Sequence, residues 1–494
     1  MRCAGRSFNR SGEHRNVRPC LFSVDMLKLP VAIRILTRRS SLLGLPPRIA
    51  TVLFLLFLCS FGGYLAAWHH APVLAQNSPD YLKLAADLAD LKIDSPPFRG
   101  PGYPLLLLLT ASVPKPGKLL VAVGLLLHFI SVWLATVWLN RLGVRPAALL
   151  VFAIIMDLPH NVQSAGFVMT ENLAQFVLTV SVLCFVTALV RTNTPLLWLS
   201  SIGIVCAALV RPTYQLLAPV LVATAWLALA LTRDGRGRFR PTVRATLVVI
   251  GTSAVLLGAY SAWNYRTFHF FGLTYQLGAN LCSRTVTIVE RLPPRFEPLR
   301  TVLIQNRNRA LVRAGSHTAL RYQWGAWKEL REITGKNDVE LAQTLLDANR
   351  VLILHNPLGF ASAVAKASAT CLFPYVTSLS TGGSGILRAL WSGIHFLLFA
   401  LCFVQVWVVS GHELLICILP TDARDSWWPE MSYETRLTYC STIAVVLYTI
   451  AISCIVDVGD PRQRWPSDIF LFVNAMLGYR FLSRVGRCRC SGTE

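Results

Sequence analysis

Long apolar stretches alternate with polar or basic connections along most of this chain. A helix needs about 20 apolar residues to cross the hydrocarbon core of a bilayer. Because backbone groups in hydrocarbon must be hydrogen-bonded within the protein, such stretches are expected to be helices. The pattern predicts an all-α polytopic membrane protein of about ten transmembrane helices. Their expected bounds are Ile49–Trp68, Leu119–Leu139, Ala147–Leu158, Val168–Val190, Leu196–Val210, Tyr214–Leu231, Val243–Trp263, Ile386–Val409, Leu437–Ile455 and Ile469–Leu482.

One polar stretch, Asn77–Pro104, follows the first expected span. Within it, Tyr81–Leu91 has leucines and alanines at helical spacing, with aspartates and a lysine between them. This amphipathic pattern predicts a short helix that lies in the membrane interface and does not cross it. Pro101 and Pro104 then redirect the chain. A structured polar loop in so apolar a chain is the first candidate for a functional site.

A second polar stretch, Tyr265–Asn356, is too long for a simple connection and is expected to form a small helical domain. Val339–Leu354 has helical periodicity and precedes Pro357, which favours a helix end there. Ala361–Phe373 is ambiguous between a weak span and an interfacial helix.

These patterns divide the chain into five segments. A basic cytoplasmic lead, partly disordered, is followed by an N-terminal transmembrane module that contains a first outer loop. An extracytoplasmic helical domain with an interfacial helix, a C-terminal group of transmembrane helices and a cytoplasmic tail complete it. Translation could start at Met1 or Met26. In the order named, the five segments are 1–48, 49–264 with the first outer loop at 69–118, 265–385, 386–483 and 484–494.

The net charge of +22 indicates which connections between the expected spans lie on the cytoplasmic side of the membrane. In a soluble protein such a charge would suggest nucleic acid, but the chain is 54% hydrophobic and its arginines cluster at the ends of expected spans. Basic residues concentrate in cytoplasmic connections of membrane proteins. We therefore expect membrane lipids and no nucleic acid as partners. The expected outer segments are Asn77–Pro104, His160–Thr170, Arg211-Pro212, Tyr265–Asn356 and Asp457–Ser467.

The 13 cysteines are scattered, many of them within apolar runs, and Cys488 and Cys490 have no His or Cys neighbours at zinc-ligand spacing. Neither a metal site nor a cofactor is expected.

Several of the outer segments carry residues that resemble one family. Tyr81, Ala85, Arg99 and the turn Pro101–Pro104 fit a pattern of acidic residue, tyrosine four positions on, short helix, basic residue and Pro-Gly-Tyr-Pro. Glu171 stands at the acidic position of a second loop, and Arg211-Pro212 and Asn264–Asn280 also fit. Arg462, Arg464 and Pro466 resemble an RxRxP element. Together they resemble the GT-C-fold glycosyltransferases, such as the protein O-mannosyltransferases and the lipid A aminoarabinose transferases.

The resemblance implies a polyprenyl-phosphate sugar as donor and a lipid, glycan or protein hydroxyl as extracytoplasmic acceptor. It also favours a bacterial inner membrane. Asp80 is the candidate base, although it fits a helix N-cap equally well. Glu171 is the second carboxylate, with a carboxylate at a helix start, capped by Thr170, as its alternative. The candidate donor-phosphate ligands are Arg99, Arg211, Arg462 and Arg464, and the candidate substrate-binding residues are Asn77, Tyr81, Tyr103 and His160.

One departure matters. Asn77 stands where the family has an acidic residue, and an amide cannot act as a base. Either Asp80 substitutes for it, or the chain is a catalytically inactive relative. A lipid or polysaccharide flippase, or another transporter, is the other alternative, and it should carry polar residues at mid-membrane depth along a path.

Overall fold

The computed structural model describes residues 45–68, 72–75, 77–93, 95–232, 235–314, 322–372, 431–456 and 463–490, with some positions between 393 and 411. The described residues form helices and no β-strand, apart from one isolated bridge between Val73 and Phe167. The expectation of an all-helical fold is therefore confirmed for this part of the chain.

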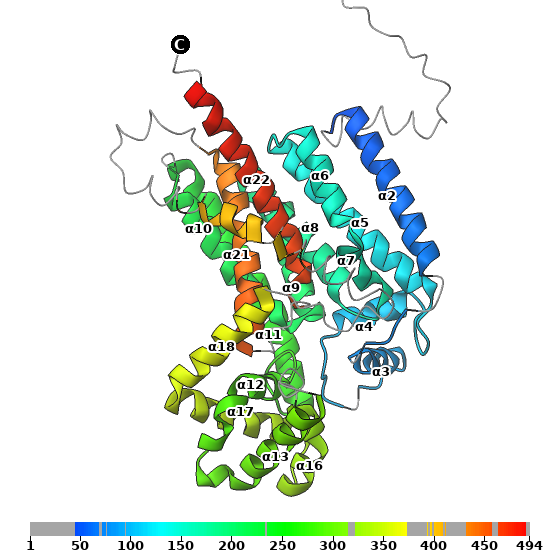
Figure 1. Cartoon of the computed structure of the whole chain (residues 1–494), viewed down its shortest axis with the longest axis vertical. Helices are drawn as coiled ribbons and strands as arrows, with labels where there is room; N and C mark the ends of the chain where they lie inside the picture. Colours follow the sequence, from blue (N-terminus) through cyan, green and yellow to red (C-terminus); the bar gives the residue numbers. More distant parts are fainter. Residues whose placement is uncertain are drawn as a thin grey trace, which may run out of the picture.

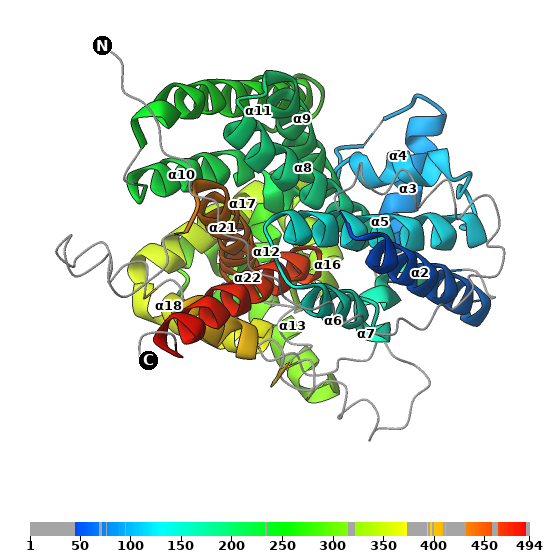
Figure 2. The ribbon, with the colours of Figure 1, turned by 90° about the horizontal axis from the view of Figure 1, so that it is seen from above.

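Six segments in the described part are long and apolar enough to cross a membrane. They stand side by side in Figure 1, and Figure 2 shows α21 and α22 between α5–α6 and α10–α11. The six are α2 (Pro47–Ala67), α5 (Lys118–Arg141), α8 (Glu171–Arg191), Pro212–Ala230 with α10 (Leu217–Ala230), α11 (Phe239–Phe268) and α21 (Tyr433–Val456).

The count of about ten spans is not confirmed by these helices. Helix α6 (Pro146–Met156) has 11 residues, a length of roughly 16 Å, which is too short for a bilayer core of about 30 Å. Helix α9 (Thr194–Val210) is also short, and α22 (Trp465–Cys490) packs against α21 and α8. Most of the span expected at Ile386–Val409 lies outside the described residues.

Arginines bind helix ends at one end of this bundle, which we call the basic end. Arg238 donates to the Val190 carbonyl oxygen at 2.7 Å, and Arg436 donates to that of Leu231 at 2.7 Å. The last carbonyl groups of a helix have no partner in the helix and carry partial negative charge, so cations there are stabilising. The end of α22 lies at the same end, at the top of Figure 1.

The opposite end carries the polar segments. Helix α3 runs from Ser78 to Ala89, where the sequence predicted Tyr81–Leu91, and α4 spans Gly102–Leu109. Tyr81 and Ala85 of α3 pack with Tyr103 and Leu107 of α4 in one apolar cluster. Between α6 and α8 lie α7 (Pro159–Val162) and the 3-10 helix η2 (Gln163–Gly166).

The second polar stretch folds into short helices with an apolar cluster of their own, at the bottom of Figure 1. Helix α17 (Asp338–His355) begins with a capping box between Asn337 and Glu340 and ends before Pro357, as the sequence predicted. Helix α18 (Pro357–Leu372) has 16 residues and packs on α12, α17 and α21. The others are α12 (Leu277–Thr285), α13 (Glu297–Ala314), α15 (Tyr322–Gly325), α16 (Trp327–Thr334) and the 3-10 helices η5 (Val286–Arg291) and η6 (Pro294–Phe296).

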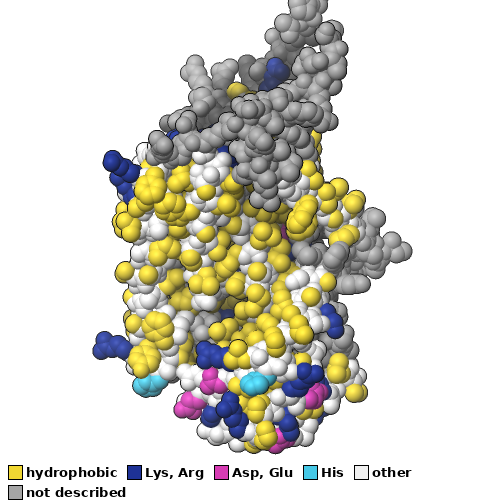
Figure 3. Space-filling view, turned by 90° about the vertical axis from the view of Figure 1, so that its left-hand side faces the viewer, with side chains coloured by type: hydrophobic (Ala, Val, Ile, Leu, Met, Phe, Trp, Pro, Cys, Tyr) yellow, Lys and Arg dark blue, Asp and Glu magenta, His cyan; other side chains and the backbone are white. Residues whose placement is uncertain are grey.

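The surface of the bundle differs from that of the polar segments at its end. On the face shown in Figure 3, apolar side chains cover the bundle and charged ones gather at its lower end. Leu247 and Val255 of α11 are among the exposed apolar side chains. Burying such a surface in water-free surroundings is favourable, so the bundle has the surface of an integral membrane protein.

Candidate active site

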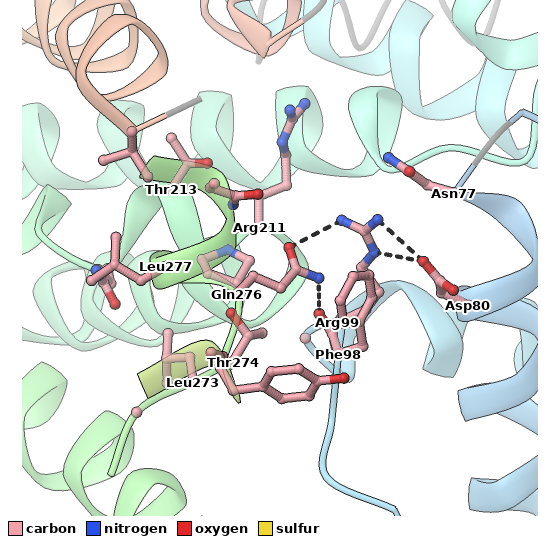
Figure 4. A pocket seen from close by; sticks show the side chains of 18 of the residues that line it. Asn77, Asp80, Phe98, Arg99, Arg211, Thr213, Leu273, Thr274, Gln276 and Leu277 are labelled. Carbon is pink, nitrogen blue, oxygen red and sulfur yellow. Dashed lines mark hydrogen bonds and ion pairs between the residues drawn. The ribbon is translucent and has the colours of Figure 1, made fainter. Parts of the chain in front are cut away.

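A cavity of about 730 Å³ lies between the bundle and the helices of the second polar stretch. Its lining includes parts of the loop 69–118, the start of α8, the end of α9, residues 270–280 and the end of α21. Figure 4 shows part of this lining. Six of the residues singled out in the sequence lie on it: Asn77, Asp80, Tyr81, Arg99, Glu171 and Arg211.

Asp80 and Arg99 meet across the loop 69–118. The Nε and Nη2 atoms of Arg99 each lie 3.2 Å from Oδ2 of Asp80, as the dashed lines in Figure 4 mark. The Asp80 side chain is 38% exposed and that of Arg99 is 19% exposed. Asp80 lies in the first turn of α3, whose N-cap residue is Asn77. The alternative that Asp80 is itself the N-cap is therefore wrong.

Two glycines hold this loop against the bundle. A Cβ atom on Gly100 would lie 2.1 Å from the Leu209 carbonyl oxygen, and one on Gly102 would lie 2.7 Å from the Val210 side chain. Only glycine permits so close an approach of two backbones. The Gly-Pro-Gly turn therefore fixes Arg99 beside the end of α9, where Arg211 follows.

Arg99 also connects the loop to the second polar stretch. Its Nη1 donates to Gln276 Oε1 at 3.4 Å, and Gln276 Nε2 donates to the carbonyl oxygen of Phe98. Figure 4 shows this chain of contacts from Asp80 through Arg99 to Gln276. The sequence marked the region Asn264–Asn280 but did not single out Gln276, because its contact with Arg99 joins residues far apart in the chain.

Glu171 and Arg211 form a second pair, with 3.5 Å between Oε1 and Nη1. Glu171 begins α8 and Arg211 follows α9, and the two helices pack closely. Because a short connection makes consecutive helices antiparallel, the start of one and the end of the next lie at the same end. Their side chains are 5% and 8% exposed, and Arg211 also donates to Gln463 Oε1.

The tyrosines lie behind the first pair. Tyr81 packs edge-to-face on Tyr103 with 5.2 Å between ring centroids, and the Arg99 guanidinium carbon lies 5.5 Å from the Tyr81 ring centre. Tyr103 is buried and does not line the cavity. Burial, and then the charge of Glu171, raises the pKa of Tyr103. Tyr103 therefore supports Tyr81, whereas the sequence suggested contact with substrate.

In the RxRxP element, Arg462 and Arg464 were expected to bind the donor phosphate. Arg464 is fully buried, its Nε lies 3.6 Å from Asp468 Oδ1, and it does not line the cavity. Gln463, between the two arginines, lines the cavity instead. Arg462 and the His160 side chain lie outside the described residues.

The arrangement suits an anionic ligand close to a carboxylate. A guanidinium binds phosphate or carboxylate oxygens with paired hydrogen bonds, so a phosphate can take the place of a partly exposed carboxylate partner. A carboxylate released in this way can accept a proton from a nearby hydroxyl. Within the described residues, no group of three His, Cys, Asp or Glu side chains is placed to hold a metal ion.

Known proteins share little with this chain at the level of sequence. No family model matches the chain, and no curated protein matches its sequence. Among solved structures, the chain is similar to the archaeal oligosaccharyltransferase AglB from Archaeoglobus fulgidus, solved with an inhibitory peptide and a dolichol-phosphate. The TM-score is 0.44 and the identity 13%, over 84% of this chain and 48% of that one, so this chain spans about half the length of AglB. Since a fold does not by itself imply a function, the activity must be argued from the site.

Proposed function

We propose that this chain is a membrane glycosyltransferase that moves a sugar from a polyprenyl-phosphate donor to an acceptor hydroxyl at the outer face of a membrane. The observation that carries the proposal is the presence of two carboxylate–arginine pairs, Asp80–Arg99 and Glu171–Arg211, in one cavity beside the bundle. The resemblance of the loop 69–118 to the first outer loop of GT-C enzymes supports it.

In the proposed reaction, Asp80 accepts the proton of the acceptor hydroxyl. The acceptor oxygen forms a bond to the anomeric carbon of the sugar, and the bond between that carbon and the phosphate oxygen breaks. The electron pair of the broken bond stays on the phosphate. Arg99 and Arg211 stabilise the negative charge that develops there, as positioned cations do in enzymes.

The pairing of Asp80 with Arg99 fits this sequence of events. Arg99 binds the Asp80 carboxylate, and a donor phosphate that takes the place of this carboxylate on Arg99 would release Asp80 at the moment when a base is needed. Glu171, at 5% exposure, is more enclosed and keeps Arg211 in place. Asn77 lies on the same lining and supplies amide contacts without acid–base chemistry.

The basic end of the bundle would face the cytoplasm and the cavity the outside, in accordance with the charge bias of membrane proteins. A bacterial inner membrane is the proposed location. The phosphate charge is met by arginines, so the proposed reaction needs no divalent ion and should continue in the presence of a chelator.

The test is sugar transfer by the purified full-length protein in liposomes, with a panel of polyprenyl-phosphate sugars and the variants Asp80→Asn and Arg99→Ala. Asp87→Asn is the matched control, because Asp87 lies on the same helix, pairs with Lys83 at 3.7 Å and does not line the cavity. Turnover in the wild type and in Asp87→Asn, but in neither cavity variant, is the expected result.

Other outcomes separate the alternatives. Turnover that survives Asp80→Asn would assign the base to Glu171. If no donor supports turnover in the wild type, Asn77→Asp tests the inactive relative: turnover restored by this variant would identify a decayed enzyme. If neither the wild type nor Asn77→Asp transfers sugar from any donor, the proposed activity is refuted.

A further inference from the structure

The cavity has a second wall whose chemistry differs from that of the two ion pairs. Five aromatic residues contribute to it, and the amides of Asn280 and Gln343 lie on the same lining. We propose, on the basis of the glycosyltransferase function above, that this wall binds a saccharide and that the acceptor is therefore a glycan. The aromatic residues are Phe98, Phe270, Phe271, Tyr275 and Trp324.

Four of the five rings of this wall pack against one another. Phe98 packs edge-to-face against Trp324 with 5.3 Å between centroids and against Tyr275 with 5.5 Å. Tyr275 packs in the same way on Phe270, and Trp324 lies on Trp327. Phe98, Tyr275 and Trp324 are partly exposed. Rigid, partly exposed rings offer large contact area at little entropic cost, and the C–H face of a pyranose ring packs on such surfaces.

The amides distinguish a saccharide from a phosphate and from a lipid chain. Within the described residues, the side chains of Asn280 and Gln343 make no hydrogen bond, although both line the cavity. An amide offers donors and an acceptor together. A sugar hydroxyl also donates and accepts, whereas a phosphate only accepts and a lipid chain does neither.

The position of the wall favours the acceptor over the donor. Except for Phe98, its residues come from 270–280 and from helices α15 and α17, whereas the two ion pairs belong to the bundle and its first loop. A lipid-linked donor reaches the cavity from the bilayer, with its phosphate at the arginines. The two walls meet at Phe98, which adjoins Arg99, so a saccharide on the aromatic wall lies next to the reacting groups.

The inference is tested by direct binding, which needs no turnover. Full-length protein in a detergent without a sugar head group is titrated with maltotetraose, cellotetraose, chitotetraose and mannotetraose, and Kd is measured by calorimetry. At least one of these is expected to bind, with Kd raised about tenfold or more in Trp324→Ala, the loss expected for a stacked ring. Trp324→Phe should keep most of the affinity, because it keeps a ring.

Two further variants show whether a loss of saccharide binding in Trp324→Ala comes from misfolding or from a non-specific effect of removing a tryptophan. Phe98→Leu removes a ring of the wall from the loop 69–118, outside the helices that surround Trp324, and should also weaken binding. Trp198→Ala is the matched control, because Trp198 is 48% exposed on α9 and does not line the cavity. Binding lost equally in Trp198→Ala, or absent with every saccharide, would overturn the inference.

Kinetic measurements show whether the bound saccharide belongs to the acceptor or to the donor. They also test the glycan acceptor and the glycosyltransferase activity independently of each other. Trp324→Ala should raise the KM of a glycan acceptor and leave that of the lipid donor unchanged; the reverse would assign the wall to the donor sugar. Transfer to an unglycosylated peptide, with no saccharide binding, would leave the glycosyltransferase intact and refute the glycan acceptor. Saccharide binding without transfer from any donor would leave the wall in place and refute the proposed activity.

Discussion

The two ion pairs of the cavity contain the same groups but lie in different surroundings. Asp80 and Arg99 are 38% and 19% exposed, whereas Glu171 and Arg211 are 5% and 8% exposed. Water can solvate the first pair when it opens, but removing a partner from the second leaves a charge in a poorly solvated place. One pair is therefore suited to exchanging partners with a ligand, and the other to holding a cation in position.

The difference follows from the elements that carry each pair. Asp80 lies on the short helix α3 and Arg99 on the loop that follows it, whereas Glu171 and Arg211 lie at the ends of two helices that pack on each other. The two carboxylate–guanidinium pairs thus differ in exposure because tertiary packing sets how much water reaches them.

Breaking the buried pair should have the largest effect on stability. Arg211→Ala leaves Glu171 without its arginine, and such a change typically costs about 3–5 kcal/mol. We expect a clear fall in the apparent melting temperature of the protein in detergent.

The matched control replaces both members of that pair, in Glu171→Gln/Arg211→Met. It should be less destabilised than Arg211→Ala, because no buried charge is left. A melting temperature of Arg211→Ala equal to that of the wild type would contradict the assigned role of the pair.

Asp80→Asn should separate activity from stability. Loss of a general base typically lowers turnover by about 10²–10⁴-fold, whereas an exposed ion pair contributes only about 0.2–1 kcal/mol to folding. We expect transfer to be nearly abolished at an almost unchanged melting temperature. A large fall in both quantities would mean that the two pairs do not differ as their exposure indicates.

Arg99→Lys tests whether the exposed pair needs the planar guanidinium. Lysine keeps the charge but cannot make two parallel hydrogen bonds to a phosphate. The KM of the lipid donor should rise in Arg99→Lys and rise further in Arg99→Ala. Identical kinetics of the wild type and Arg99→Lys would show that charge alone suffices.

Gln276→Leu should have the smallest effect of these changes. It removes two hydrogen bonds, the contact of 3.4 Å between Gln276 and Arg99 and the one that Gln276 donates to the Phe98 carbonyl oxygen. A hydrogen bond typically contributes about 0.5–1.5 kcal/mol. A modest rise in the donor KM, with turnover retained, is expected. A loss as large as that of Arg99→Ala would move Gln276 from a positioning role to direct contact with substrate.

The sequence determined much of the fold, because its signals are local. Helical periodicity and the following Pro357 located α17 almost to its ends, and the amphipathic pattern located α3 within a few residues. The apolar runs found the six candidate spans, but they also included Ala147–Leu158, where the helix Pro146–Met156 is too short to cross. Each of these features depends on residues a few positions apart.

The tertiary structure decided which singled-out residues act together. It placed Asp80, Arg99, Glu171 and Arg211 on one cavity, but buried Tyr103 and Arg464 away from its lining. The contacts of Arg99 with Gln276 and of Arg211 with Gln463 join residues far apart in the chain. Residue type fixes what chemistry a side chain can perform, whereas its partners and its exposure to water arise only when distant segments pack together.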